Sequence, residues 1–417
     1  MIDIRILRKN PELVKDNCRK RSIEVDIDDL HQKDQQYLSL LQEIESMRGE
    51  RNRLSKQAGE DTEVRRKVKE LKKSIGEKEK KAEQLKNEVT ETLAWVPNFP
   101  APDVPPGEDD DENVEVRAWT GERQPFDFTP REHDELGQLT GIIDTARGSK
   151  VAQAGFYYWV GKGAALANAL FFWGQQQLTK HGFTQCITPC LAKERTLYGS
   201  GYLPFFAEET YKLENEDLSL IGTSEQTLIG FHADETLSSE SLPVCYSAFS
   251  PCFRTEAGSH GKATRGIFRV HQFHKVEQIV LCHPEQSEEY HQFCQKNEEE
   301  IMQQLRIPYR VVNVCVGDLG APGYKKYDIE AWFPGHGGYR EVTSNTNLTD
   351  FQARRLNIRY QETDKRRDFV HTISATGVTD RLACAIMENN QRSDGTVDVP
   401  EVLQPYTGFA QIEPTAG

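Results

Sequence analysis

Apolar residues recur every three or four positions in two stretches near the N-terminus, with charged residues between them. The first stretch runs from Leu30 to about Leu54, and the second begins at Val64. This spacing predicts two amphipathic helices that pack as a coiled coil. The apolar positions are Tyr37, Leu41, Ile44 and Met47 in the first helix, and Val68, Leu71, Ile75, Ala82, Leu85, Val89 and Leu93 in the second. Because the intervening SKQAGEDTE has no apolar anchor, we expect an antiparallel arm about 45 Å long, at roughly 1.5 Å per residue.

Basic side chains gather on both sides of the predicted turn. They are Arg48, Arg51, Arg53 and Lys56 before it, and Arg65, Arg66, Lys67, Lys69, Lys72 and Lys73 after it. Most charge runs of this kind form the solvated face of a helix. Clustered cations also attract a nucleic-acid backbone without regard to its sequence. Their position at the tip of a long arm favours the second interpretation.

The pattern changes after the arm. Residues 97–113, PNFPAPDVPPGEDDDEN, hold five prolines and an acidic run, which predicts an extended, non-helical linker. Residues 153–189 then indicate a strand, a long amphipathic helix and a strand that ends at Pro189. Further on, strands such as IPYRVVNVCV and YDIEAWFP mix with helical stretches without regular alternation. This order favours an α+β domain with an antiparallel sheet.

Composition is that of an ordinary globular protein. The 417 residues are 37% hydrophobic and 28% charged, with a formal net charge of −14, so two or three domains are expected. Residues 1–96 hold 22 Lys and Arg against 20 Asp and Glu, so the negative excess belongs to the rest of the chain. Such a charge argues against a protein that coats nucleic acid everywhere, but it is compatible with a local basic surface.

Location and metal content follow from what the sequence lacks. It has neither an apolar run of about 18 residues nor an apolar N-terminal leader, so we expect no membrane span and a cytoplasmic protein. Nine cysteines at irregular spacings do not resemble a disulfide framework. Cys186 and Cys190 have the spacing of half a zinc site, but no second pair accompanies them.

One short segment, 253-FRTEAGSHGKATRGIFRVHQFHKVEQ-278, concentrates charge of both signs. The flanking VCYSAFSPCF and HQFHKVEQIVLC alternate apolar and polar residues, which predicts two strands joined by a polar, glycine-rich loop. The charged residues of this hairpin are Arg254, Glu256, Lys262, Arg265, Arg269, Lys275 and Glu277.

This hairpin resembles motif 2 of the class II aminoacyl-tRNA synthetases, and in detail that of bacterial-type seryl-tRNA synthetases. The resemblance continues through the arm, the proline-rich segment, FDFTPREHDELG, ARGSKVAQAGFYYW, the motif 1 proline at Pro189 and DFQARRLNIRY. It implies an α+β fold, with an antiparallel-sheet class II catalytic domain preceded by an N-terminal antiparallel two-helix coiled-coil arm. The expected boundaries are a tRNA-binding helical domain at 1–96, a linker at 97–114 and the catalytic domain at 115–417.

Roles for individual residues follow from the resemblance. Arg254 would hold the α-phosphate of ATP and Arg381 the γ-phosphate, and both would be catalytic, since arginine grips phosphate oxygens and stays charged. Glu256 would read the adenine amino group and Phe273 would stack on the ring. The implied ATP-binding set is Arg254, Thr255, Glu256, Phe273, Glu341, Val342, Thr343, Ser344 and Arg381, with Glu341 and Ser344 also holding Mg²⁺.

The resemblance also implies a serine-binding set. It comprises Thr223, Ser224 and Glu225 of GTSEQT, Glu277 of the hairpin, and Thr376 as the ligand of the serine hydroxyl. The carboxylates would pair with the ammonium group of the substrate, which explains why acids lie among phosphate-binding cations. Taken singly, Glu277 is equally suited to be an ion-pair partner of Lys275, and Thr223 to be a buried hydroxyl bonded to backbone.

The segment 374-SATGVTDR-381 departs from the family forms NGSGLAVGR and NATxxATTR. Ser374 stands at the asparagine position, the loop is one residue shorter, and Asp380 precedes Arg381. We expect Asp380 to cap the following helix, with pairing to Arg381 as the alternative. A milder change replaces SSCSN by TSNTN.

The implied function is that of a serine–tRNA ligase, which forms seryl-adenylate from L-serine and ATP and transfers serine to tRNA(Ser), with tRNA(Sec) as a further acceptor. The resemblance also implies a homodimer with tRNA bound across the subunits, contacted by Arg48, Arg51, Arg53, Lys56, Arg65, Arg66, Lys69 and Lys72 of the arm. Two alternatives stay open. One is a related enzyme that acylates a non-tRNA acceptor, and the other is an inactive RNA-binding protein.

Overall fold

The computed structural model describes residues 1–57, 61–121, 125–257, 266–362 and 366–415. The chain divides into two compact units, Met1–Pro97 and Asn98–Gly417. Lys262 and Arg265 of the hairpin loop lie outside the described residues.

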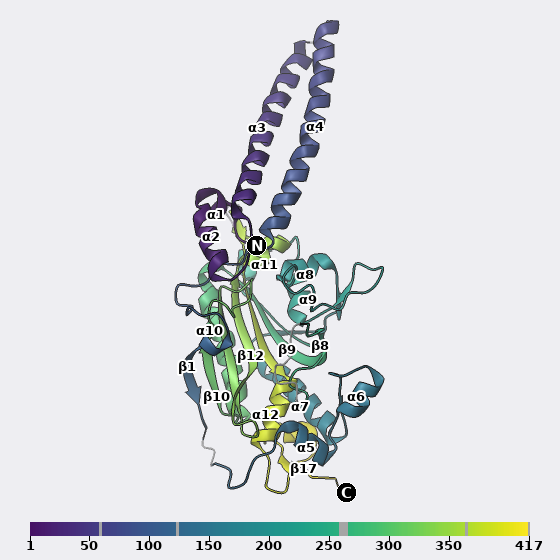
Figure 1. Ribbon diagram of the computed structural model, residues 1–417, viewed down its shortest axis with the longest axis vertical. Coiled ribbons are helices and arrows are strands. Elements are labelled where there is room, and N and C mark those ends of the chain that lie inside the picture. Colours follow the sequence, from purple (N-terminus) through teal and green to yellow (C-terminus); the bar gives the residue numbers. More distant parts are fainter. Residues whose placement is uncertain (58–60, 122–124, 258–265, 363–365, 416–417) are drawn as a thin grey trace. The chain divides into compact units, whose positions relative to one another are not determined.

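The first unit is helical, and its long helix pair forms the predicted antiparallel arm (Figure 1). Its elements are α1 (Ile4–Lys9), α2 (Pro11–Lys20), α3 (Ile27–Gln57) and α4 (Thr62–Leu93). The arm packs through Leu40, Ile44, Ile75, Ala82 and Leu85, flanked by partly buried Tyr37 and Met47. Leu41, predicted to face the partner helix, is 40% exposed instead, because its neighbour Leu40 occupies the seam.

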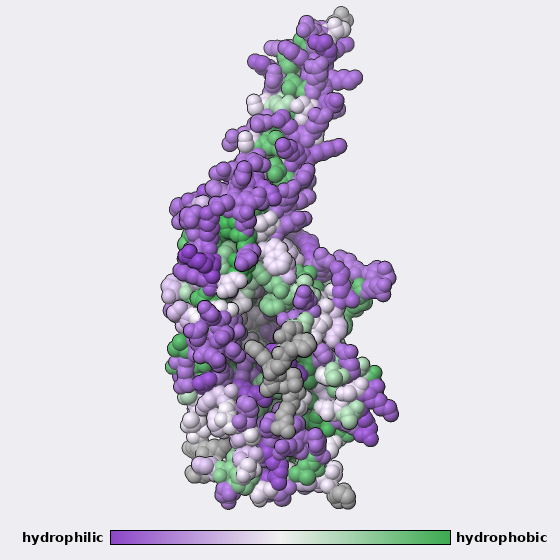
Figure 2. All heavy atoms as spheres, viewed as in Figure 1, coloured by the Kyte–Doolittle hydropathy of each residue, from purple (hydrophilic) through white to green (hydrophobic). Residues whose placement is uncertain are grey.

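Ion pairs connect the arm helices across the seam. Lys78 Nζ lies 2.6 Å from Glu43 Oε2, and Arg48 lies 2.8 Å from Glu79 Oε1. Asp61 accepts hydrogen bonds from the first backbone N–H groups of α4 and so caps it. Figure 2 shows the resulting surface, with hydrophilic side chains outside and an apolar seam between the helices.

The second unit is built on an eight-stranded sheet with the order β1-β10-β11-β12-β15-β9-β8-β4. Neighbouring strands are antiparallel, apart from the parallel pair β4 and β8 at one edge. The predicted antiparallel α+β fold is confirmed. The strands are β1 (Val114–Trp119), β4 (Thr184–Cys186), β8 (Val244–Phe253), β9 (Gln272–Cys282), β10 (Tyr309–Asn313), β11 (Lys325–Phe333), β12 (Gly338–Thr349) and β15 (His371–Thr379).

Helices α7 (Lys162–Lys180), α10 (Ser287–Gln304) and α12 (Asp380–Asn389) share one apolar core with the sheet. The remaining helices are α5 (His133–Thr140), α6 (Thr145–Val151), α8 (Glu194–Ser200), α9 (Ser224–Gly230), α11 (Phe351–Leu356) and α13 (Gln404–Thr407), with short 3₁₀ turns η1 (Asp110–Glu112), η2 (Ser239–Ser241) and η3 (Pro284–Gln286). The small strands are β2 (Ile143–Asp144), β3 (Tyr158–Trp159), β5 (Leu191–Ala192), β6 (Ser219–Leu220), β7 (Thr236–Ser238), β13 (Arg359–Gln361), β14 (Arg367–Phe369), β16 (Val397–Asp398) and β17 (Gln411–Ile412).

The proline-rich segment is not a free linker. Ala101 and Val104 are buried against Leu319, and the side-chain amide of Asn98 donates to two carbonyls of the second unit at 3.0 Å. A 3₁₀ turn forms at η1, where we expected only extended chain. Prolines correctly indicated the absence of an α-helix, but they carry no information about what the segment packs against.

Candidate active site

Two neighbouring cavities lie against the central strands of the sheet. The first, of about 160 Å³, is bordered by the hairpin strand β9 and by β12, β15 and α12. The second, of about 270 Å³, extends towards α9 and β11. Arg254, Lys275 and Ser344 line both cavities, so the two spaces meet at these three side chains.

Four cations and three carboxylates of the described chain line the first cavity. Arg254 stacks over the Phe273 ring, with its guanidinium carbon 5.2 Å from the ring centroid, and its Nε is buried without a hydrogen-bond partner among the described residues. Arg381 donates to Glu341 Oε2 at 3.0 Å and to the Phe268 carbonyl at 3.2 Å. Both arginines line the cavity, and a guanidinium group is suited to bind an anion.

Glu341 stays ionised beside these cations. Burial opposes ionisation of its carboxyl, but the charges of Arg381 and Lys326 outweigh this effect and lower its pKa to about 2. Val342 and Thr343 also border the first cavity. The predicted stretch Glu341–Ser344 thus lies together on β12.

The hairpin turns sharply at Glu256. This residue has φ of 53°, a left-handed conformation that is uncommon for glutamate, and it borders the first cavity within 3.4 Å of Arg269. Such conformations concentrate at ligand sites. Thr255, predicted to bind ATP, lines neither cavity. Its hydroxyl donates to the carbonyl of Glu208 at 2.6 Å and so holds the neighbouring loop.

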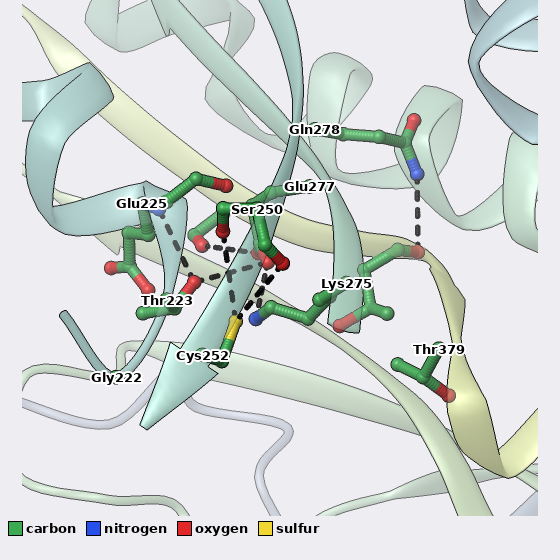
Figure 3. A network of polar contacts seen from close by, with 12 residues as sticks. Gly222, Thr223, Glu225, Ser250, Cys252, Lys275, Glu277, Gln278 and Thr379 are labelled. Atoms are coloured by element: carbon green, nitrogen blue, oxygen red, sulfur yellow. Dashed lines mark hydrogen bonds and ion pairs between the residues drawn. The ribbon is translucent and has the colours of Figure 1, made fainter. Parts of the chain in front are cut away.

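Glu277 is the centre of a polar network in the second cavity (Figure 3). Its Oε2 accepts from the hydroxyl of Thr223 at 3.2 Å and its Oε1 from the hydroxyl of Ser374 at 3.1 Å. The Lys275 ammonium forms an ion pair with the same carboxylate. These side chains share a face of β9 because residues 275 and 277 are two apart on a strand.

Helix α9 supplies the other acid. Thr223 is its N-cap and accepts from the backbone N–H of Glu225, which directs the Glu225 side chain into the second cavity. Gln352 donates to Glu225 Oε1 at 2.7 Å. Burial, and then the charge of Glu277, raises the pKa of Glu225. Ser224, predicted to bind serine, lines neither cavity, and its hydroxyl points to the carbonyl of Ala248.

The departures from the family form have specific positions. Thr376, predicted as the ligand of the serine hydroxyl, lines the first cavity, and Ser374 lines the second. Asp380 does not cap α12, because it is the first residue of the helix and Thr379 is its N-cap. The Asp380 carboxylate accepts instead from the indole of Trp159 at 2.8 Å and from the backbone N–H of His274 at 2.5 Å.

Some lining residues were not predicted from the sequence. Lys326 lines the second cavity, and its Nζ lies 3.0 Å from Asp328 Oδ2. Asp328 lies in the predicted strand YDIEAWFP and Lys326 directly precedes it, so a lysine and an aspartate two positions apart were the available signal. Phe268 and Val270 border the first cavity, and nothing in their local sequence distinguishes them from core residues.

The basic residues of the arm lie near its tip. Arg48, Arg53, Lys56, Arg65, Arg66, Lys67, Lys69, Lys72 and Lys73 are exposed, and Arg51 is half-buried. Some of them have acidic neighbours: Arg48 at Glu79, Arg66 at Glu70 and Lys73 at Glu77. The tip therefore presents a positively charged surface on both helices.

Comparisons with known proteins agree along the whole chain. Residues 1–100 match the seryl-tRNA synthetase N-terminal domain, and residues 209–390 match the tRNA synthetase class II core domain (G, H, P, S and T). The chain is 44% identical to the serine–tRNA ligase of Rubrobacter xylanophilus, with 99% of both chains covered. It belongs to the seryl-tRNA synthetase family.

Solved structures of the family superimpose closely. The seryl-tRNA synthetase from Pyrococcus horikoshii, complexed with ATP, is 42% identical with a TM-score of 0.94, and all of both chains is covered. The cytoplasmic serine–tRNA ligase from Naegleria fowleri, in complex with AMP, is 32% identical with a TM-score of 0.89, covering 100% of this chain and 99% of that one. The fold of this synthetase is thus the family fold in both units.

Among the described residues, no group of three or more His, Cys, Asp or Glu side chains is arranged to hold a metal ion. No helix in the described part of the chain is both long and apolar enough to cross a bilayer.

Proposed function

We propose that this protein activates L-serine with ATP and transfers the seryl group to tRNA(Ser). The observation that carries the proposal is the junction, at Arg254, of a cavity lined by Arg269 and Arg381 with a cavity lined by Glu225 and Glu277, within a chain that matches the family over its full length. An aminoacyl adenylate has a phosphate at its centre and an ammonium group at one end. The arginines of the first cavity suit the phosphate, and Glu225 and Glu277 of the second suit the ammonium group.

ATP occupies the first cavity in this proposal. Arg254 binds the α-phosphate, Arg381 binds the γ-phosphate and Phe273 stacks on adenine, with Glu256 at the adenine amino group. The Arg254 Nε, buried without a protein partner among the described residues, supports an anionic ligand there. Thr255 acts indirectly, because its hydroxyl holds the loop that contains Glu208.

Serine occupies the second cavity. Glu277, Glu225 and Thr223 bind its ammonium group, since carboxylates near a cation are stabilised in their charged form. We assign the serine hydroxyl to Ser374 in place of Thr376, because Ser374 lines the second cavity and Thr376 does not. A site built to hydrogen-bond a substrate hydroxyl rejects the analogue that lacks it by roughly 10⁴-fold, so alanine is excluded in this way.

The donors near the junction suit Mg²⁺. The ion prefers oxygen ligands and usually takes one or two carboxylates together with substrate phosphates. Glu341, ionised because its pKa is about 2, and the Ser344 hydroxyl would hold it. When bound there, Mg²⁺ neutralises phosphate charge.

The arm binds tRNA in this proposal. Its exposed cations, on both helices beside the tip, supply attraction to a phosphate backbone. We further propose a cytoplasmic homodimer in which the arm of one subunit holds a tRNA whose acceptor end enters the partner's active site. The tRNA-binding unit is residues 1–96, and the catalytic domain is residues 115–417 together with the segment 97–114 that packs on it.

The test is serine-dependent ATP–pyrophosphate exchange, with alanine and threonine as controls, followed by charging of total tRNA in the same preparation. We expect exchange with serine only, and charging. Exchange without charging would indicate a non-tRNA acceptor. Absence of exchange would refute the proposal.

A further inference from the structure

Lys275 lies where the two cavities meet, and neither substrate has yet been assigned to it. The residue is 8% exposed, and its side chain extends from β9 next to Glu277. Together with Arg254 and Ser344, it lines both cavities. Figure 3 shows the lysine directed towards the carboxylate network of Glu277 and Thr223.

The position of the reacting bond follows from the two cavities. Serine activation joins the substrate carboxylate to the α-phosphate of ATP. With the nucleotide in the first cavity and serine in the second, these atoms meet at the junction. The cations that border both cavities, Arg254 and Lys275, are therefore the side chains nearest to the charge that develops there.

The ion pair between Lys275 and Glu277 allows the Lys275 ammonium to change partners when serine binds. Glu277 binds the Lys275 ammonium and is also the proposed partner of the serine ammonium. One carboxylate that already accepts from Thr223 and Ser374 does not fully neutralise two ammonium groups, and the two cations repel each other. The arrival of serine thus weakens the hold of Glu277 on Lys275.

We propose that Lys275 is a catalytic residue of the activation step. The serine ammonium takes over Glu277, and the Lys275 ammonium turns to the α-phosphate, where it and Arg254 bind the non-bridging oxygens. This inference rests on the proposed function. It couples serine binding to the supply of positive charge at the reacting phosphorus.

The step balances without proton transfer. A carboxylate oxygen of serine forms a bond to the α-phosphorus, and the bond from that phosphorus to the bridging oxygen of the β-phosphate breaks. Pyrophosphate leaves with the electron pair. Lys275 remains protonated throughout and stabilises the transition state electrostatically.

The experiment compares Lys275→Met, which keeps the stem but removes the charge, with Lys275→Arg in pyrophosphate exchange. Because removal of one donor to a developing charge lowers kcat by about 10²–10³-fold, we expect a fall of that order in Lys275→Met. The KM for serine should change by less than about threefold, since a transition-state contact acts on kcat. Lys275→Arg should recover at least a tenth of the wild-type kcat, because it restores the charge.

A role confined to bracing Glu277 predicts the opposite. Lys275→Met would then raise the KM for serine and leave kcat near the wild-type value, and this result would overturn the inference, as would equal losses in Lys275→Met and Lys275→Arg. Lys162→Met is the matched control, because Lys162 forms an exposed pair with Glu413 and lines neither cavity. Lack of exchange in the wild-type protein would refute the proposed function itself, so the two failures are distinguishable.

Discussion

Replacing Asp380 tests whether its carboxylate holds helix α12 in place. The carboxylate is 2% exposed and connects three elements. It belongs to α12, and it accepts hydrogen bonds from Trp159 of β3 and from His274 of β9. Arg381, the next residue, donates to Glu341 in the first cavity. Loss of the carboxylate should loosen the start of α12 and displace that arginine.

The expected loss of folding stability follows from the hydrogen-bond donors that lose their acceptor. Asp380→Ala leaves the indole N–H of Trp159 and the backbone N–H of His274 without their acceptor. An unsatisfied buried donor costs about 1–3 kcal/mol, and both donors are partly buried, so we expect a loss of about 3 kcal/mol. Asp380→Asn retains one acceptor oxygen and should lose about half as much.

Thermal unfolding and exchange kinetics provide the assay. For a unit of this size, about 3 kcal/mol lowers the Tm by roughly 6 °C. The KM for ATP should rise several-fold in Asp380→Ala and less in Asp380→Asn. Asp394→Ala, at an exposed position, is the control and should change stability by less than about 1 kcal/mol. A Tm and a KM for ATP unchanged in Asp380→Ala would refute the reasoning.

Four further variants test the site and the arm. Arg254→Ala should abolish pyrophosphate exchange and spare tRNA binding, measured by filter retention; near-normal exchange would contradict its phosphate role. Deletion of residues 40–85, closed by a short linker, should spare exchange and remove charging, and undiminished charging would exclude the arm as a tRNA contact. Ser374→Ala should raise the KM for serine about tenfold, as loss of a buried hydrogen bond predicts, whereas an unchanged KM would reassign the hydroxyl ligand. The pKa of Glu225 is raised in the folded protein, so this carboxyl favours folding at acidic pH and opposes it once pH exceeds the folded pKa. Glu225→Gln should therefore have a higher Tm than wild type at neutral pH, and the difference in Tm should close on acidification. A pH-independent difference would contradict the raised pKa.

Local patterns predicted the elements that depend on neighbours in sequence. The heptad spacing indicated both arm helices, and the alternation around the hairpin indicated β8 and β9. Where two adjacent positions were both apolar, the pattern was ambiguous. Leu40 faces the seam in place of Leu41 because packing against α4 selects one of the two.

Contacts between residues far apart in the chain could not be predicted from the sequence. Asp380 has the local character of a helix cap, but its partners Trp159 and His274 lie 221 and 106 positions away. Ser374 and Thr376 share one side of a strand by alternation, yet a bulge follows Thr376 in the pairing of β15 with β9. The cavity that each residue lines was therefore decided by tertiary structure.

The segment around Asn98 determines where this protein can be divided. Asp103 pairs with Lys325 at 2.6 Å, and the buried Val104 supports Leu319, which lines the second cavity. A fragment that begins at residue 98 keeps these contacts. A fragment that begins at residue 115 lacks them, so Leu319 in the wall of the second cavity loses its support. Arms should accordingly be exchanged between relatives at the boundary of residues 97 and 98. The proline-rich stretch packs on the second unit and should stay with it.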